Sequence, residues 1–106
     1  MRALATTGKT RSEHLPDLPA VAEFVPGYEN QTWNGIGVPA RTPPVIIERL
    51  NREVVAILQT PDMKEAARVE AYSIVGGTPA QFGEHLRAEH AKMARLVKDA
   101  GIKSTE

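Results

Sequence analysis

The sequence predicts an α/β fold with a few short strands and three helices. Three amphipathic segments each begin at a Thr-Pro pair, short runs of strand-forming residues lie between them, and glycine or proline marks the joints. The 106 residues are enough for one small domain. A free-standing sheet of two or three strands is one possible arrangement, but the pattern favours part of a larger α/β sheet whose other strands are missing.

The N-terminal forty residues predict two strands joined by a loop. Residues 2–7 predict a short strand, and residues 8–19 form a polar loop whose prolines favour extended backbone. A helical turn is expected over residues 20–24. Residues 31–38 predict the second strand, because Thr, Trp, Ile and Val favour sheets, although two glycines weaken this prediction.

The remaining residues predict three helices. In each Thr-Pro pair, Thr can serve as N-cap and Pro as the first helical residue. Gln81 adds a capping box to the third helix, and Gly101 is a natural stop. The expected helices cover residues 43–59, 61–71 and 78–100, with a short strand over residues 72–75. The Thr-Pro pairs are Thr42-Pro43, Thr60-Pro61 and Thr78-Pro79.

Composition argues against several classes of function. Lys and Arg together number 13, as do Asp and Glu, so the zero net charge argues against nucleic-acid and electrostatic membrane binding. The absence of cysteine excludes disulfides, thiolate catalysis and Cys-ligated metals. No apolar run approaches the ~20 residues that span a bilayer. Residues 1–8 lack the apolar core of a signal peptide, which implies a cytoplasmic chain if Met1 is the true start.

Patterns typical of enzymes or metal sites are weak. His85 and His90 lie five residues apart, so they project about 140° apart around a helix and cannot easily share one ion. We interpret His90 as a residue at the boundary of the apolar stripe. The Gly8-Lys9-Thr10 run lacks the upstream glycine of a phosphate-binding loop. We therefore expect no catalytic residue, metal or cofactor.

Trp33 is the only tryptophan, and it lies beside two glycines in the predicted strand over residues 31–38. One interpretation is a core residue on the inward strand face. The other is a residue that lines a pocket, because glycine lets a ligand or another backbone approach closely. Both interpretations can hold at once.

Seven motifs in order resemble one known family, the extracytoplasmic solute receptors of tripartite tricarboxylate transporters, or Bug receptors. Its strand of the R-A-L-A type precedes an L-P-D-x-P-T-x-x-E loop, a P-G-Y-E turn and a W-x-G-x-x-x-P strand. A T-P helix with L-N-x-E follows, and a late G-[ST]-P-x-x-F helix ends in A-G-I-K. Here the motifs correspond to residues 2–5, 15–23, 26–29, 33–39, 42–53, 77–82 and 100–103.

The resemblance implies the C-terminal portion of a two-domain periplasmic binding protein of type II-like, or Venus-flytrap, fold. Residues 1–40 would supply the strands and loop that cross between domains, and residues 41–103 the helical C-terminal part. Such receptors are periplasmic, bind small carboxylates in the cleft between domains and deliver them to membrane permease subunits. They are not enzymes and need no metal. A chain with only part of the cleft is expected to bind ligand weakly or not at all.

Two positions depart from the family pattern. Ala20 stands where the family usually has Thr, so a hydroxyl is lost from that loop. Asn34 follows Trp33 where an aromatic residue is common, and an amide facing the cleft would bring hydrogen bonding in place of ring stacking. The resemblance makes Trp33 and Asn34 the candidate ligand-binding residues.

Two alternatives remain open from the sequence. One is a free-standing small α/β interaction module that self-associates through an exposed sheet edge. The other, more distant, is an enzyme.

Overall fold

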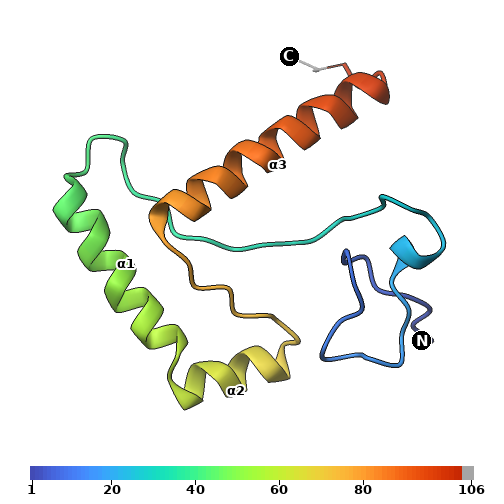
Figure 1. Ribbon diagram of the computed structural model, residues 1–106, viewed down its shortest axis with the longest axis horizontal. Coiled ribbons are helices and arrows are strands. Elements are labelled where there is room, and N and C mark those ends of the chain that lie inside the picture. The colour runs from blue at the N-terminus through green and yellow to red at the C-terminus, as the bar shows by residue number, and fades with distance from the viewer. Residues whose placement is uncertain (104–106) are drawn as a thin grey trace.

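The computed structural model describes residues 1–103 and contains three α-helices. A short 3-10 turn, η1 (Val21–Glu23), precedes α1 (Pro44–Leu58), α2 (Pro61–Val69) and α3 (Pro79–Asp99) (Figure 1). The three helices predicted from the sequence are therefore confirmed, and η1 falls within the expected helical turn. No helix among residues 1–103 is both long enough and apolar enough to cross a membrane.

Side-chain caps begin α2 and α3 as predicted. The Thr60 hydroxyl accepts a hydrogen bond from the Met63 N–H at 3.4 Å. At α3 the Thr78 hydroxyl accepts from the Gln81 N–H at 3.2 Å, and the Gln81 side-chain oxygen accepts from the Thr78 N–H at 2.9 Å. This reciprocal pair is the capping box, and it satisfies two backbone donors that the first turn leaves without partners.

The predicted Thr42 cap of α1 is wrong. Pro43 occupies the N-cap position with φ −58° and ψ 141°, and no side chain caps this helix. The cause is the Pro-Pro pair, because a residue that precedes proline is excluded from the helical region. Pro43 is therefore extended, the helix starts at Pro44, and the Thr42 N–H instead donates to the Pro39 carbonyl at 3.0 Å.

Left-handed residues end α2 and α3. Gly101, with φ +65°, stops α3 as predicted, whereas Ala71 takes the same role after α2 with φ +56°. Each helix closes with a bond from the second residue past its cap to a carbonyl in its last turn. These bonds run from Ile102 N–H to Val97 O (3.1 Å) and from Tyr72 N–H to Ala67 O (2.8 Å). The turn at Ala71 explains why α2 ends at Val69, two residues before the predicted end.

The predicted strands do not form. Among residues 1–103 the only β pairing is one isolated parallel bridge between Thr6 and Ala20. We expected strands over residues 2–7, 31–38 and 72–75 because their side chains favour sheets. A strand also needs a backbone partner. Residues 31–38 have no such partner among the described residues. The described fold is helical rather than α/β. It offers no sheet edge, so the expected self-association through such an edge is also wrong.

The helices form an open arrangement around α1. This helix contacts both α2 and α3. The Asn51 side-chain amide donates to the Gly77 carbonyl at 2.9 Å, which ties α1 to the turn before α3. Residues 30–41 run from the N-terminal loop past the start of α3 to the start of α1 (Figure 1).

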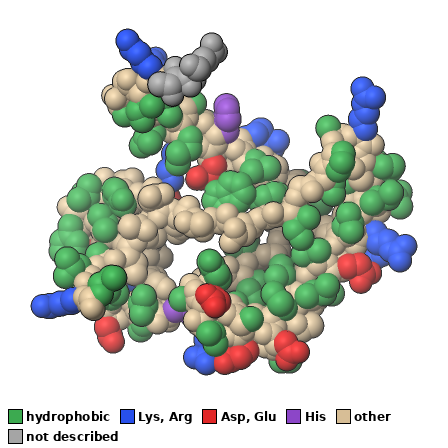
Figure 2. All heavy atoms as spheres, turned by 180° about the vertical axis from the view of Figure 1, so that it is seen from behind, with side chains coloured by type: hydrophobic (Ala, Val, Ile, Leu, Met, Phe, Trp, Pro, Cys, Tyr) green, Lys and Arg blue, Asp and Glu red, His purple; other side chains and the backbone are tan. Residues whose placement is uncertain are grey.

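The chain has almost no core of its own. Ala20 is the only buried hydrophobic residue among those described. The radius of gyration is 17.1 Å, whereas a compact domain of this length has about 13 Å. Apolar side chains lie in the open on several elements, and the molecule has an opening through its middle (Figure 2). The exposed set includes Ile36, Val45, Ile46, Ile57, Leu96 and Val97.

The caps yield a direct test of the helix starts. We expect Thr78→Ala to cost about 1 kcal/mol of local stability, or roughly a fivefold faster amide exchange in the first turn of α3. Thr42→Ala should leave amide exchange in the first turn of α1 unchanged, because Thr42 caps nothing. Hydrogen exchange measured by NMR on both variants checks this. Equal acceleration in the two helices would contradict the assigned starts.

Candidate functional site

The first turns of α3 present two rings to the extended segment that carries Trp33. Phe82 and His85 are three residues apart on α3, so both side chains lie on one face of the helix. The capping box fixes the start of this helix. It also relies on Gly77, because a Cβ there would approach the Gln81 side-chain oxygen to 2.7 Å.

Trp33 packs edge-on against both rings. Its ring centroid lies 5.7 Å from that of Phe82 and 5.0 Å from that of His85, with interplanar angles of 78° and 86°. Phe82 and His85 stack on each other at 6.2 Å. Edge-to-face pairs of this kind contribute about 0.5–1.5 kcal/mol each beyond simple burial. Trp33 remains 41% exposed, so this three-ring cluster holds the segment without enclosing it.

Gly35 lies directly against the ring of Phe82. A Cβ built at Gly35 would overlap the tip of that ring and lie 2.9 Å from its Cε2 atom. A Cβ at Gly37, two residues on, would meet no atom within 4 Å. The close approach expected of the glycines in this segment therefore occurs at Gly35, and it is made to a ring of α3.

The two predicted ligand-binding residues have different surroundings. Trp33 and Gly35 both face α3. Asn34 and Ile36, by contrast, are exposed. The Asn34 amide makes no hydrogen bond within residues 1–103. The structure thus brings Trp33 together with Phe82 and His85, and leaves Asn34 on the open side.

The two histidines of α3 have different surroundings. His85 packs against Trp33, and His90 is exposed, as are Leu86 and Met93 of the apolar stripe beside it. Within the described residues, no group of three His, Cys, Asp or Glu side chains is placed to hold an ion.

An ion pair in the N-terminal loop was not foreseen from the sequence. Arg11 donates to both oxygens of the Glu23 carboxylate, at 3.0 and 2.8 Å. The Ala20 N–H donates to the same carboxylate at 2.7 Å. The hydrogen bonds from Arg11, and then the one from Ala20, lower the pKa of Glu23 below its ordinary value. The carboxylate therefore connects both ends of the loop.

The hydroxyl of Thr6 is buried beside this loop. It has no hydrogen-bond partner among the described residues, although the Thr6 N–H and C=O pair with Pro19 and Val21 on either side of Ala20. Thr6 and Ala20 are the two residues of the one β-bridge found within the described part of the chain.

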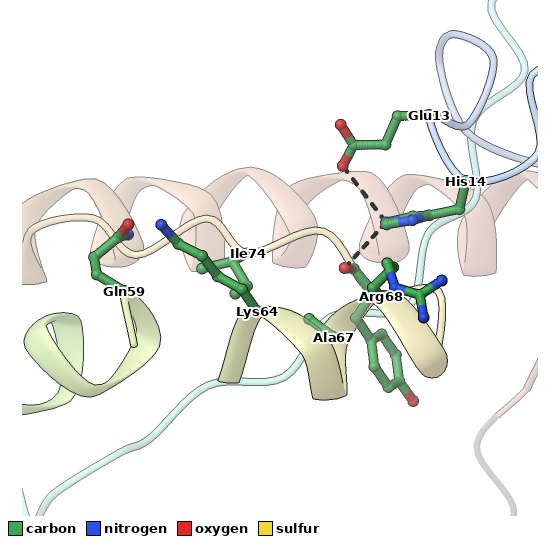
Figure 3. Close-up of a pocket in the computed structure, with 8 residues that line it drawn as sticks. Glu13, His14, Gln59, Lys64, Ala67, Arg68 and Ile74 are labelled. Carbon is green, nitrogen blue, oxygen red and sulfur yellow. Dashed lines mark hydrogen bonds and ion pairs between the residues drawn. The ribbon is translucent and has the colours of Figure 1, made fainter. Parts of the chain in front are cut away.

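A shallow depression of about 270 Å³ lies where the loop meets α2 (Figure 3). The His14 ring nitrogen Nε2 lies 3.2 Å from the Tyr72 carbonyl oxygen and 3.5 Å from a Glu13 carboxylate oxygen. Lys64 and Arg68 also line it, but Arg68 is held by Glu65 at 2.7 Å. The depression is open and carries both acidic and basic side chains. We therefore interpret it as a contact between the loop and α2 rather than as a carboxylate site.

The comparisons with known proteins agree on one family. Residues 1–102 match the family described as "Tripartite tricarboxylate transporter family receptor". BugT of Bordetella pertussis is 33% identical over 104 residues, which cover 97% of this chain and 32% of BugT. The UPF0065 protein in the clcB-clcD intergenic region of Pseudomonas knackmussii is 35% identical over 108 residues, covering all of this chain and 64% of that protein.

A third relative is the UPF0065 protein in the tcbD-tcbE intergenic region of a Pseudomonas species. It is 31% identical over 108 residues, which cover all of this chain and 32% of that protein. The chain belongs to the tripartite tricarboxylate transporter receptor family, a family of transporter receptors and not of enzymes. It spans about a third of the length of two of these relatives and less than two thirds of the other.

The contrast between the two glycines tests the contact with α3. Gly35→Ala should displace Phe82 and change the emission of Trp33, the only tryptophan, because both rings belong to one cluster. Gly37→Ala, the matched control, should leave the emission spectrum unchanged. Steady-state fluorescence of the two variants decides this, and indistinguishable spectra would contradict the packing.

The Glu23 ion pair predicts a pH dependence of the loop. A carboxylate with a lowered pKa stabilises the folded loop fully above its ordinary pKa of about 4.3. This contribution is lost as the pH falls below that value and through the lowered folded pKa. The Ala20 amide resonance should shift over this window and should stay flat in Glu23→Gln. A shift of the same size in Glu23→Gln would rule out this carboxylate as the cause.

Proposed function

We propose that this chain forms the C-terminal part of a two-domain, extracytoplasmic solute receptor that binds small carboxylates for a tripartite tricarboxylate-type transporter. The observation that carries the proposal is the family match over residues 1–102. The chain's share of about a third of BugT supports a role as one part of a longer receptor. The nearly absent core supports the same role, because a self-sufficient domain buries far more of its apolar surface.

The two halves of the chain have different roles in the proposed receptor. Residues 1–40 supply the crossing between the domains, and residues 41–103 supply helices of one domain. The long, mostly unpaired path of residues 30–41 supports a crossing role, since it connects the N-terminal loop to α1 without a turn of helix (Figure 1).

Trp33 and Asn34 have different roles in this proposal. Trp33 positions the segment through its contacts with Phe82 and His85. Asn34 is exposed, so its side-chain N–H groups are available to a ligand carboxylate. The receptor works in the periplasm, where it takes up its carboxylate ligand and passes it to the membrane permease subunits. Its binding chemistry needs hydrogen-bond donors, and no metal or cofactor takes part.

Calorimetric titration with citrate and with glutamate tests this function. The 106-residue chain alone should give no saturable heat in the micromolar range, because it holds only part of a cleft. A receptor in which this chain replaces the matching third of BugT should bind at least one small carboxylate. Micromolar binding by the isolated chain, or a folded receptor that binds no carboxylate, would contradict the proposal.

Two substitutions at one position test the role of Asn34 in that receptor. Asn34→Asp should weaken carboxylate binding at least about tenfold more than Asn34→Ala, because it adds charge repulsion to the loss of the donor. Equal effects of the two substitutions would remove Asn34 from the ligand site and leave the receptor function intact.

A further inference from the structure

The Asn34-Gly35 pair lies on open backbone. An Asn-Gly pair is typical of a tight hairpin turn, in which backbone hydrogen bonds hold both residues. Here the pair belongs to an extended segment, and the nearest backbone hydrogen bonds along the chain are those donated by Asn30 and Thr42. Within residues 1–103 neither residue of the pair makes a backbone hydrogen bond, and the Asn34 side chain is exposed.

Such a pair has the groups for a reaction within the chain. The backbone nitrogen of Gly35 can attack the side-chain carbonyl carbon of Asn34, Cγ, and close a succinimide ring. A side chain on the following residue would crowd this attack, whereas glycine has no Cβ and leaves the backbone free to rotate into position. Asparagine is among the thermolabile residues for this kind of reason.

The chain contains two other asparagines that serve as an internal comparison. Asn30 and Asn51 are followed by glutamine and arginine, whose side chains crowd the same attack. Asn51 also lies inside α1, where backbone amides are paired along the helix, and its side-chain amide donates to the Gly77 carbonyl at 2.9 Å. Of the three asparagines, Asn34 alone precedes a glycine.

We propose that Asn34 is a site of spontaneous deamidation, and that this modification ends carboxylate binding by the receptor. Hydroxide removes the proton of the Gly35 amide, and the nitrogen forms a bond to Asn34 Cγ. The bond from Cγ to Nδ2 breaks, and Nδ2 takes a proton from water and leaves as ammonia. Water then opens the succinimide at Cγ, which gives aspartate, or at the backbone carbonyl carbon, which gives isoaspartate. The reaction consumes only water.

Both products change the chemistry at position 34. A carboxylate replaces the amide, so two hydrogen-bond donors are lost and only acceptors remain. The modification also adds one negative charge to a chain whose net charge is zero, and residues 30–40 contain no ionisable side chain to offset it. A ligand carboxylate would be repelled. This effect rests on the proposed function, because it takes Asn34 as a donor to the ligand, whereas the covalent step does not depend on that function.

The covalent step is tested on the 106-residue chain, incubated in mildly alkaline buffer and digested for mass spectrometry. We expect aspartate and isoaspartate at position 34, formed at least about tenfold faster than at Asn30 or Asn51. A free peptide of residues 30–41 should react within about threefold of the rate in the chain, because no backbone hydrogen bond restrains the pair. In that peptide, Gly35→Ala should slow the reaction at least about tenfold.

Two results would overturn the covalent step. One is conversion of Asn34 no faster than that of Asn30 and Asn51. The other is a rate in the chain at least about tenfold below that of the peptide, which would mean that the contacts with α3 hold the pair in an unreactive form.

The effect on binding is tested on the receptor in which this chain replaces the matching third of BugT. Calorimetric titration with citrate and glutamate, before and after the same incubation, should show binding lost in proportion to the fraction modified at position 34. Asn34→Gln should bind after incubation as its own fresh sample does, because glutamine does not form the succinimide. Unchanged binding by a modified receptor, or an equal loss in incubated Asn34→Gln, would overturn the effect. A fresh receptor that binds no carboxylate would refute the proposed function and this effect together, while the covalent step is decided on the chain alone.

Discussion

Hydrogen bonds at the helix ends hold the described structure, since there is almost no core to do so. Thr60 and Thr78 cap two helices, and left-handed turns at Ala71 and Gly101 close them. These contacts are all local in the sequence. Among the longer connections, the Asn51 bond to Gly77 and the cluster around Trp33 join other segments to the start of α3. A chain organised in this way has defined elements but leaves their apolar faces without a cover.

The uncovered faces agree with the proposed function. The extended segment that carries Trp33 contacts α3 on one side, and within residues 1–103 its backbone has no hydrogen-bond partner. A receptor that closes around a ligand needs segments that pass between its domains. In the proposed receptor, a segment that α3 holds on one face and that is otherwise exposed would meet this need.

Features that depend on neighbouring residues could be predicted from the sequence, whereas features that depend on distant residues could not. The helices and two of their caps were predictable, because Thr, Pro, Gln and Gly act on their immediate neighbours. The Thr42 cap was mispredicted because Pro44 forces Pro43 out of the helix. The strands were mispredicted because pairing depends on residues distant in sequence, and the described chain supplies only the bridge at Thr6 and Ala20.

The contacts around Trp33 also depend on residues that are distant in the sequence. Trp33 stood out as a lone tryptophan beside glycines, but no local pattern identified Phe82 and His85 as its partners, since they lie some fifty residues away in the sequence. The Arg11–Glu23 pair spans twelve residues of loop and has no periodic signature either. The close contact of Gly35 with Phe82 likewise joins residues distant in the sequence.

The central claim is that this chain is one part of a longer receptor. Immunoblotting of periplasmic and cytoplasmic fractions from the source cells, with an antibody raised against the 106-residue chain, tests it most directly. The account predicts a periplasmic band at about three times 11.5 kDa, because the chain covers 32% of BugT. A single cytoplasmic band at 11.5 kDa would contradict it.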